Sequence, residues 1–380
     1  MKVISIGTDR KVFEEESQVF GRNVEYASKM DELHIVVFTL KREGLTAKKI
    51  GNLYLYPTNS FSEWLYVWDA LRLSKNLISQ RGLLKNTVIS TQDPFQCGFV
   101  GVKLAKRFHL PLQVQVHTDF LSPYFSKSFF NKVRKIIASY VIPRASSLRV
   151  VGDMIKNSIE KKFSNLKIPI NVLPIFFDVE KMAHLSTSQV DKSLNFPQLK
   201  FTVLMASRLT KEKRIDVALC AFKKVLESFP YAGLVIAGSG PEENNLKNLT
   251  KELGLTSAVV FLGWRDDLLS LYKSANVFLL TSEYEGYGMV LVEAALSSCP
   301  IITTNVGIAQ SGIFVNGVNS FVCPVGDVDA IARAILELIT DNAKRELFKW
   351  KMQDSIKEKM ISKEEYMASY IALLQNLLRK

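Results

Sequence analysis

The stretch "TSEYEGYGMVLVEAA", residues 281–295, places two glutamates around a glycine turn and directly follows the apolar run "NVFLL". The run predicts a buried strand, Gly286 and Gly288 predict a turn, and "MVLVEAA" predicts the start of a helix. Because glutamate is rarely buried without a partner, we expect Glu285 and Glu293 to accept hydrogen bonds from a ligand at the carboxyl end of this strand. The alternative is a solvated loop glutamate at 285 and a glutamate at 293 that the helix dipole favours.

Strands alternate with helices along the whole chain, which indicates parallel sheets covered on both faces. Two sets of strands predict two doubly wound α/β domains, residues 1–180 and residues 200–360, with a polar linker near 178–200. The amphipathic pattern at residues 361–380 predicts a helix that either caps the second domain or braces the first. The runs expected to form strands are "KVISIG", "LHIVVFTL", "TVIST", "LQVQVH", "SLRVVG", "INVLPIF", "FTVLMAS", "AGLVIAG", "AVVFLG", "NVFLLTS", "PIITT" and "SFVCP".

Composition and charge narrow the class of protein. The chain has 380 residues, 47% of them apolar, which is enough for two globular cores. Its four cysteines are widely spaced, so they predict neither a disulfide framework nor a zinc site, and a reducing cytoplasm is expected. The net charge of +12 is uneven, because residues 1–180 contain 26 Lys and Arg against 16 Asp and Glu. This basic half suits a phosphorylated acceptor, anionic lipid or nucleic acid, but the sequence holds no recognisable nucleic-acid-binding motif.

Other strand-to-turn junctions of the second half carry residues suited to a nucleotide. In "MASRLTKEKRIDVAL", residues 205–219, a strand ends before Arg208 and Lys213, two cations that suit a pyrophosphate. We interpret the neighbouring Lys211 and Arg214 as solvated charges. Because the carboxyl ends of parallel strands lie at one edge of a sheet, these junctions predict a single binding site. Two further junctions contain glycines, Gly238 with Gly240 and Gly263 before Trp264.

Four segments within residues 200–340 together resemble the donor domain of glycosyltransferase family 4: "ASRLTKEKRID", "IAGSGPEENNL", "FLGWRDDLLSLYKSANVFLLTSEYEGYGMVLVEAALSSCPIITTNVG" and "VNSFVCPVGDVDAIARAI". The E-x7-E element from Glu285 to Glu293 is the specific part of the resemblance. It implies the GT-B architecture, two Rossmann-like doubly wound parallel-sheet domains that face a central cleft. It also implies transfer of a sugar from a nucleoside diphosphate to an acceptor, with retention at the anomeric carbon and with no metal or other cofactor.

The resemblance implies a role for each matched residue. Arg208 and Lys213 would hold the diphosphate, Glu293 the ribose hydroxyls, and Glu285 the donor sugar. In the first half, "LPLQVQVHTDF" resembles the strand whose terminal histidine, here His117, reaches the donor sugar and the reacting centre. The other donor-binding residues would be Gly7, Gly238, Gly263, Trp264, Arg265, Gly286, Tyr287, Gly288, Met289 and Val290, with the turn at 263–265 beside the base.

The chain departs from the family pattern at four places. "GTDRKVFEEES" replaces the Gly-Gly turn of the first loop, so that only Gly7 is offered to the donor. Arg214 stands where relatives have glycine, and "IAQSG" replaces a Gly-x-x-Glu element after Gly307. The Pro-Asn-Gly-Val-Asp element appears as "PIFFD", which retains Asp178. These departures leave the base and the sugar open, although a UDP- or GDP-linked sugar is expected.

Two other patterns have competing interpretations. Asp327-Val328-Asp329 resembles a metal-binding Asp-x-Asp motif, but its position before "AIARAILELI" favours a helix cap at Asp327, and no metal site is expected. Residues 122–144 interleave aromatic and basic side chains, which suits either an anionic membrane surface or a helix whose aromatics pack on their own domain. Family members often use lipid-linked acceptors, which favours peripheral contact with the inner face of the cell membrane.

We therefore expect a hexosyltransferase of cell-surface polysaccharide or glycolipid synthesis, with a nucleotide-sugar donor and a glycan or lipid-linked acceptor. One alternative is a sugar-nucleotide epimerase of the same two-domain build, which needs no acceptor. The other is a non-catalytic module whose basic face binds nucleic acid or a partner. Release of one diphosphate per acceptor glycosylated separates transfer from epimerisation, and strongly salt-dependent oligonucleotide binding is the signature of the binding module.

Overall fold

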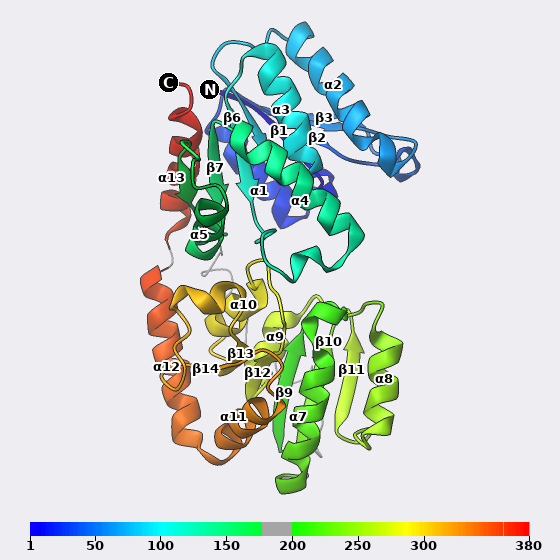
Figure 1. Ribbon diagram of the computed structural model, residues 1–380, viewed down its shortest axis with the longest axis vertical. Helices are drawn as coiled ribbons and strands as arrows, with labels where there is room; N and C mark the ends of the chain where they lie inside the picture. Colours follow the sequence, from blue (N-terminus) through cyan, green and yellow to red (C-terminus); the bar gives the residue numbers. More distant parts are fainter. Residues whose placement is uncertain (177–199, 360, 380) are drawn as a thin grey trace. The chain divides into compact units, whose positions relative to one another are not determined.

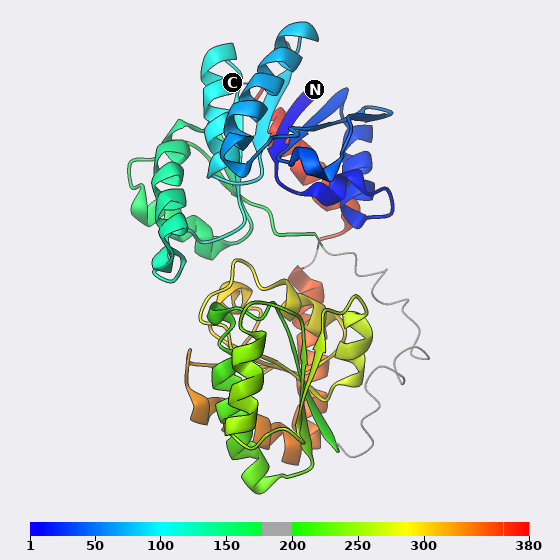
Figure 2. The same cartoon turned by 90° about the vertical axis from the view of Figure 1, so that its right-hand side faces the viewer.

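The computed structural model describes residues 1–176, 200–359 and 361–379. Contacts divide the chain into two compact units: unit 1 consists of Met1–Phe176 with Ser362–Lys380, and unit 2 of Phe177–Ile361. Figures 1 and 2 show a sheet with flanking helices in each unit. No helix in the described ranges is long and apolar enough to cross a membrane.

The sheet of unit 2 consists of six parallel strands. Their spatial order is β11 (Val259–Gly263), β10 (Ala232–Ala237), β9 (Phe201–Ala206), β12 (Val277–Leu280), β13 (Ile301–Thr304) and β14 (Phe321–Cys323). Every residue of β9 and β10 is buried, because both faces of the sheet are covered, and this explains their continuous apolar sequences. The strand order reverses between β9 and β12, and open α/β sheets bind ligands at the carboxyl ends of the strands at such a reversal.

Helices cover both faces of this sheet. One core joins Val277 and Leu279 of β12 to α7 (Ile215–Ser228), α8 (Glu243–Glu252) and α11 (Val328–Thr340). Phe278 points to the opposite face, where it meets Tyr272 of α9 (Leu268–Ser274) with ring centroids 5.2 Å apart. Helix α10 (Met289–Leu296) contacts α9 and also α12 (Asn342–Lys359).

The sheet of unit 1 has eight strands, of which only β3 is antiparallel to its neighbour. Their spatial order is β3 (Lys48–Ile50), β4 (Leu53–Pro57), β2 (Glu32–Val37), β1 (Lys2–Gly7), β5 (Thr87–Thr91), β6 (Leu112–Val116), β7 (Ser147–Val150) and β8 (Ile170–Val172). The order reverses between β1 and β5, as it does between β9 and β12 in unit 2. Both units are therefore doubly wound, as predicted.

The C-terminal helix belongs to unit 1. Helix α13 (Lys363–Gln375) begins at a capping box made by Ser362 and Glu365, and it shares a core with α1 (Gln18–Ser28) and the sheet. Its Tyr370 stacks on Tyr26 with ring centroids 4.7 Å apart, and Figure 2 shows α13 in red beside the blue N-terminal elements. The remaining helices of this unit are α2 (Tyr66–Gln80), α3 (Gln96–Phe108), α4 (Phe129–Val141) and α5 (Asp153–Lys162).

All twelve apolar runs form strands, and the second sheet begins at Phe201 as expected. Sequence patterns do not predict β3 and β4, because "KKI" has no apolar run and "LYLYP" ends in a proline that disfavours a strand interior. β3 is the edge strand of the sheet, where such sequences are tolerated, and β4 lies next to it. The expected linker at 178–200, apart from Lys200, lies outside the described residues.

Candidate active site

The reversal of strand order in unit 2 brings two predicted elements together. The loop after β9 contains Arg208 and Lys213, and the loop after β12 contains Glu285. Because β9 and β12 are adjacent and parallel, both loops leave the sheet at the same edge, where Figure 1 also shows α10. The site is therefore built from residues about 70 positions apart in the chain.

Lys213 and Glu285 form a buried ion pair at this edge. The Lys213 Nζ lies 2.6 Å from Glu285 Oε1, and the side chains are only 13% and 9% exposed. Ser282 donates its hydroxyl to the same carboxylate oxygen at 2.7 Å. The pair holds a positive and a negative group side by side at the carboxyl edge of the sheet. The solvated-loop alternative for Glu285 is therefore wrong.

Arg214 has a backbone conformation that suits the glycine which the resemblance implies at this position. It is the first residue after the 3-10 turn Lys211–Lys213 and has φ +49°, a left-handed conformation that glycine adopts more easily than other residues. The guanidinium lies 3.1 Å from Asp216 and 3.8 Å from Glu283, and these ion pairs help to hold the strained backbone. Arg214 is thus a structural ion-pair residue rather than a freely solvated charge, whereas Lys211 is exposed as predicted.

Glu293 has a partner within the protein. It lies in the second turn of α10, as predicted, and accepts a hydrogen bond of 3.1 Å from the hydroxyl of Tyr272. Burial raises the pKa of Glu293, and the Tyr272 hydrogen bond opposes that shift. The expectation of a ligand as the only hydrogen-bond partner of Glu293 is therefore incomplete. Tyr272 donates a hydrogen bond within the protein and orients this carboxylate before any nucleotide binds.

We expect nucleoside diphosphate binding to weaken as the pH falls through the raised pKa of Glu293, because only the ionised carboxylate accepts two ribose hydroxyls. The stability of the ligand-free protein changes in the opposite sense. A carboxyl whose folded pKa is raised stabilises the fold at low pH, and this contribution is lost as the pH rises through that pKa. Calorimetric titration of nucleotide from pH 4.5 to 7.5 should show the acid loss in the wild type and a flatter profile in Glu293→Gln.

A glycine-supported turn sets the start of α10. Gly288 is its N-cap with φ +92°, and Met289 and Val290 form the first turn, whose N–H groups have no partner within the helix. Such a terminus favours phosphate. The carbonyl of Tyr287 accepts a 2.7 Å hydrogen bond from the N–H of Ile308. A Cβ at the preceding Gly307 would lie 2.5 Å from that same carbonyl, so only glycine fits there.

Gly238 and Gly240 have a structural explanation that needs no ligand. A Cβ at 238 would lie 1.8 Å from the carbonyl oxygen of Ser207, and one at 240 would lie 2.4 Å from that of Leu209. Both glycines let the loops after β10 and β9 cross in direct contact. A donor contact at Gly238 stays a prediction, but the close approach of the two backbones accounts for the glycine.

The turn after β11 presents an exposed aromatic ring beside a fixed guanidinium. Gly263 has φ +68° and reverses the chain, and the following Trp264 is 71% exposed. Arg265 makes two hydrogen bonds to Asp267, at 2.8 and 2.5 Å, at the start of α9. Arg208 is exposed, and its side chain makes no hydrogen bond or ion pair with another described residue. Trp264 and Arg208 are thus available to a ligand, whereas Arg265 is already engaged.

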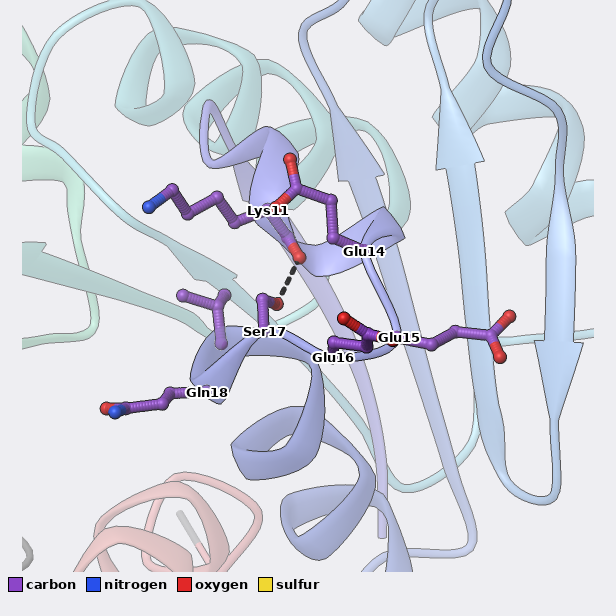
Figure 3. Close-up of a pocket in the computed structure, with 7 residues that line it drawn as sticks. Lys11, Glu14, Glu15, Glu16, Ser17 and Gln18 are labelled. Atoms are coloured by element: carbon purple, nitrogen blue, oxygen red, sulfur yellow. Dashed lines mark hydrogen bonds between the residues drawn. The ribbon is translucent and has the colours of Figure 1, made fainter. Parts of the chain in front are cut away.

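The first loop of unit 1 differs from a phosphate-binding turn. Gly7 ends β1, and the N–H of Thr8 donates to the Gln92 side chain at 3.1 Å, an interaction that the sequence patterns do not predict. Farther along, a hollow is lined by Lys11, the acidic run at 14–16 and Ser17 (Figure 3). Ser17 donates to the Lys11 carbonyl at 2.5 Å and caps α1. Three carboxylates repel phosphate, so this hollow is unsuited to a nucleotide.

His117 follows β6 and is held as a neutral imidazole. Burial, with smaller contributions from Arg149 and Arg22, lowers its pKa to about 3. Its ring Nε2 lies 3.2 Å from Gln115 Oε1, which also accepts a 2.8 Å hydrogen bond from Arg149. Because Gln115 Oε1 can only accept, the proton of His117 resides on Nε2 and Nδ1 is left as an acceptor. At neutral pH, His117 therefore serves as a hydrogen-bonding group and not as a general acid.

Asp327 caps a helix as predicted. Its carboxylate accepts a 2.9 Å hydrogen bond from the N–H of Ala330 at the start of α11, while Asp329 pairs with Lys224. Among residues 1–176, 200–359 and 361–379, no three His, Cys, Asp or Glu side chains form a metal-binding group. Asp178 lies outside the described residues.

Comparison with known proteins indicates the class of enzyme. Residues 186–354 match the family model for glycosyl transferases group 1. The match spans 169 of the 380 residues, so this part of the chain resembles the group 1 glycosyl transferases. An uncharacterized glycosyltransferase of Methanocaldococcus jannaschii is 27% identical over 337 residues, which cover 83% of this chain and 85% of the relative. The UDP-Gal:alpha-D-GlcNAc-diphosphoundecaprenol alpha-1,3-galactosyltransferase of Escherichia coli is 25% identical over 275 residues, 70% of each chain.

Solved structures show the fold of this glycosyltransferase. The Anabaena protein HepE in complex with UDP-glucose superposes with a TM-score of 0.76 and 19% identity, covering 99% of this chain and 100% of that one. At this identity the likeness shows the GT-B fold alone. Other curated relatives match over part of their length, 45% and 53% in two cases. The predicted resemblance is thus confirmed at the level of a GT-B glycosyltransferase, while family 4 in particular stays a prediction.

Proposed function

We propose that this glycosyltransferase moves a hexose from a UDP-linked donor to a glycan or lipid-linked acceptor, with retention at the anomeric carbon and without a metal ion. The Lys213–Glu285 pair is the observation that carries the proposal, because it sets a cation for the leaving diphosphate beside an acceptor for sugar hydroxyls. HepE binds UDP-glucose on the same fold, which favours uracil over guanine.

Each residue of the site has a role in this reaction. Lys213 and the free guanidinium of Arg208 neutralise the departing diphosphate, and the N-terminus of α10 adds backbone N–H groups. Glu293, oriented by Tyr272, holds the ribose, and Trp264 offers its exposed ring to the base. The acceptor hydroxyl enters on the face that the diphosphate leaves, so no covalent intermediate is required. Catalysis then rests on positioning and on stabilisation of the leaving group.

The acceptor side of the proposal includes peripheral contact with the cytoplasmic face of a membrane through residues 122–144. Phe125 is buried and stacks on Phe95, so the domain-packing interpretation holds for this ring. Phe129 and Phe130 are 74% and 67% exposed, so it does not hold for them. The Escherichia coli relative is named for a lipid diphosphate acceptor, which agrees with a membrane-bound substrate.

A panel of UDP-, GDP- and ADP-sugars tests the donor. A ligand that binds only the folded state at about 100 times its Kd stabilises it by about 2.7 kcal/mol, so the matching donor should raise Tm by several degrees. We expect the largest shift with a UDP-sugar. With that donor, one UDP should be released for each acceptor glycosylated. Interconversion of the donor without acceptor would instead indicate an epimerase.

A further inference from the structure

An exposed aromatic patch lies in unit 1, whereas the Lys213–Glu285 pair belongs to unit 2. It consists of Phe61, Trp64, Leu65 and Trp68 at the 3-10 turn Glu63–Leu65 and the start of α2, and we call it the η3–α2 patch. Phe61 is 80% exposed, Trp64 84% and Trp68 72%. The opposite face of α2 is buried in unit 1. Large rings left in water on a folded surface mark a contact with a partner.

Lysine and arginine side chains lie beside this patch, together with the exposed carboxylate of Glu63 within it. Lys41 and Arg42 are exposed beside it, and the Lys41 Nζ lies 4.7 Å from the centroid of the Phe61 ring. Unit 1 as a whole contains 29 Lys and Arg against 16 Asp and Glu, a net charge of +13. Unit 2 contains 20 against 21, a net charge of −1. The whole positive charge of the protein therefore belongs to the unit that carries the exposed rings.

A second segment of unit 1 has the same composition. Helix α4 exposes Phe129, Val133 and Ile136, which are spaced along one face of the helix, and Ile136 is 70% exposed. Lys132 and Arg134 are exposed between them. In Figure 1 the start of α2 and the start of α4 lie on the same, right-hand side of unit 1, and this side faces the viewer in Figure 2. Two apolar segments with basic neighbours thus share one side of the unit.

We propose that the η3–α2 patch inserts into the interface of an anionic bilayer, with Trp64 and Trp68 at the level of the lipid headgroups. Tryptophan flanked by Lys and Arg has this preference, because its ring is apolar while its N–H and the neighbouring cations remain with water and phosphate. A sugar-stacking platform is a poorer fit, since it needs rings supported by protein on one face. A partner protein is also a poorer match for the charge of unit 1.

The patch adds to the contact proposed for residues 122–144, and to that extent the inference rests on the proposed function. One amphipathic helix gives weak, reversible binding, whereas two contacts on one side of the unit bind more tightly and fix its orientation. The expected consequence is that loss of either segment lowers bilayer affinity sharply, and that loss of the η3–α2 patch leaves nucleotide binding by unit 2 unchanged.

Tryptophan fluorescence tests the inference directly, because the chain has only four tryptophans. The other two, Trp264 and Trp350, are 71% and 65% exposed, so Trp264→Phe/Trp350→Phe should fold and report on the patch alone. Vesicles of phosphatidylcholine with phosphatidylglycerol should shift its emission to the blue, and brominated acyl chains should quench it. Vesicles of phosphatidylcholine alone should neither shift nor quench this emission.

Vesicle co-sedimentation of the otherwise native protein provides the second measurement. Trp64→Ser/Trp68→Ser should lower the partition coefficient at least 10-fold, while Trp350→Ser, the matched control in unit 2, should not change it. Tryptophan emission that does not shift with anionic vesicles would overturn the inference. An equal blue shift with soluble oligosaccharide would also overturn it. Donor-induced Tm shifts in Trp64→Ser/Trp68→Ser, which retains Trp264, report on the transferase proposal independently, so that either can fail without the other.

Discussion

Glu285→Gln should lower kcat/KM by at least ~100-fold if the proposed function holds, because it removes the carboxylate assigned to the donor sugar and unpairs the cation assigned to the diphosphate. Glutamine keeps the shape of the side chain and can still accept from Ser282, so the turn before α10 should persist. The rate should be measured with the donor that gives the largest thermal shift. Nucleotide affinity should fall less than kcat, because the contact to the sugar strengthens as the anomeric carbon gains charge.

The same substitution carries a stability cost that must be separated from its effect on the rate. Removing one partner of a buried ion pair leaves the other charge uncompensated, at a cost of about 3–5 kcal/mol. Lys213→Met should be similarly destabilised. The double variant Lys213→Met/Glu285→Gln has no orphan charge, and its free energy of unfolding should lie closer to that of the wild type than either single variant's.

The double variant therefore separates folding from catalysis. If the pair serves the reaction, the double variant regains stability but stays inactive. If the pair is only structural, its activity returns with its stability. Glu283→Gln is the matched control, because it neutralises a buried carboxylate two residues away that pairs with Arg214 instead. It should lose stability and keep most of its activity. Near-wild-type kcat/KM in Glu285→Gln contradicts the assignment outright.

Local sequence patterns predict the elements and the edge at which the site lies. Apolar runs are sufficient for every described strand except β3 and β4, because buried parallel strands tolerate few other residues. The turn before α10 is signalled by its own glycines. The position of Glu293 on α10 follows from helical periodicity. These features depend on short stretches of chain, so they can be read without knowledge of strand order.

Side-chain contacts between different strands and helices depend on the strand order. Local sequence patterns therefore do not predict them. Tyr272 appears in the sequence as an ordinary apolar residue of a short helix, yet its hydroxyl orients Glu293. The pKa of His117 is lowered in part by Arg149, which reaches it only because β6 and β7 are neighbours. At Arg214 the left-handed backbone angle suits the glycine of the family pattern, and the arginine holds it with ion pairs to Asp216 and Glu283.

Arg208→Ala should reduce kcat/KM by ~100-fold, about 3 kcal/mol of transition-state stabilisation, with no change in the free energy of unfolding. We expect kcat/KM to change without the free energy of unfolding because the Arg208 side chain is exposed and bonds to no other described side chain. Its loss leaves no buried charge and no cavity. Affinity for UDP should fall as well, since the guanidinium binds the diphosphate in the product complex too.

Lys211→Ala is the matched control, because it removes one exposed positive charge from the same loop. If Arg208 acts only through the general positive field, the two variants should be equally impaired, and added salt should weaken the wild type to a similar extent. If it grips the diphosphate directly, only Arg208→Ala loses activity. Arg208→Lys should then recover a small part of the rate, because lysine supplies the charge without the two-pronged geometry that matches phosphate oxygens.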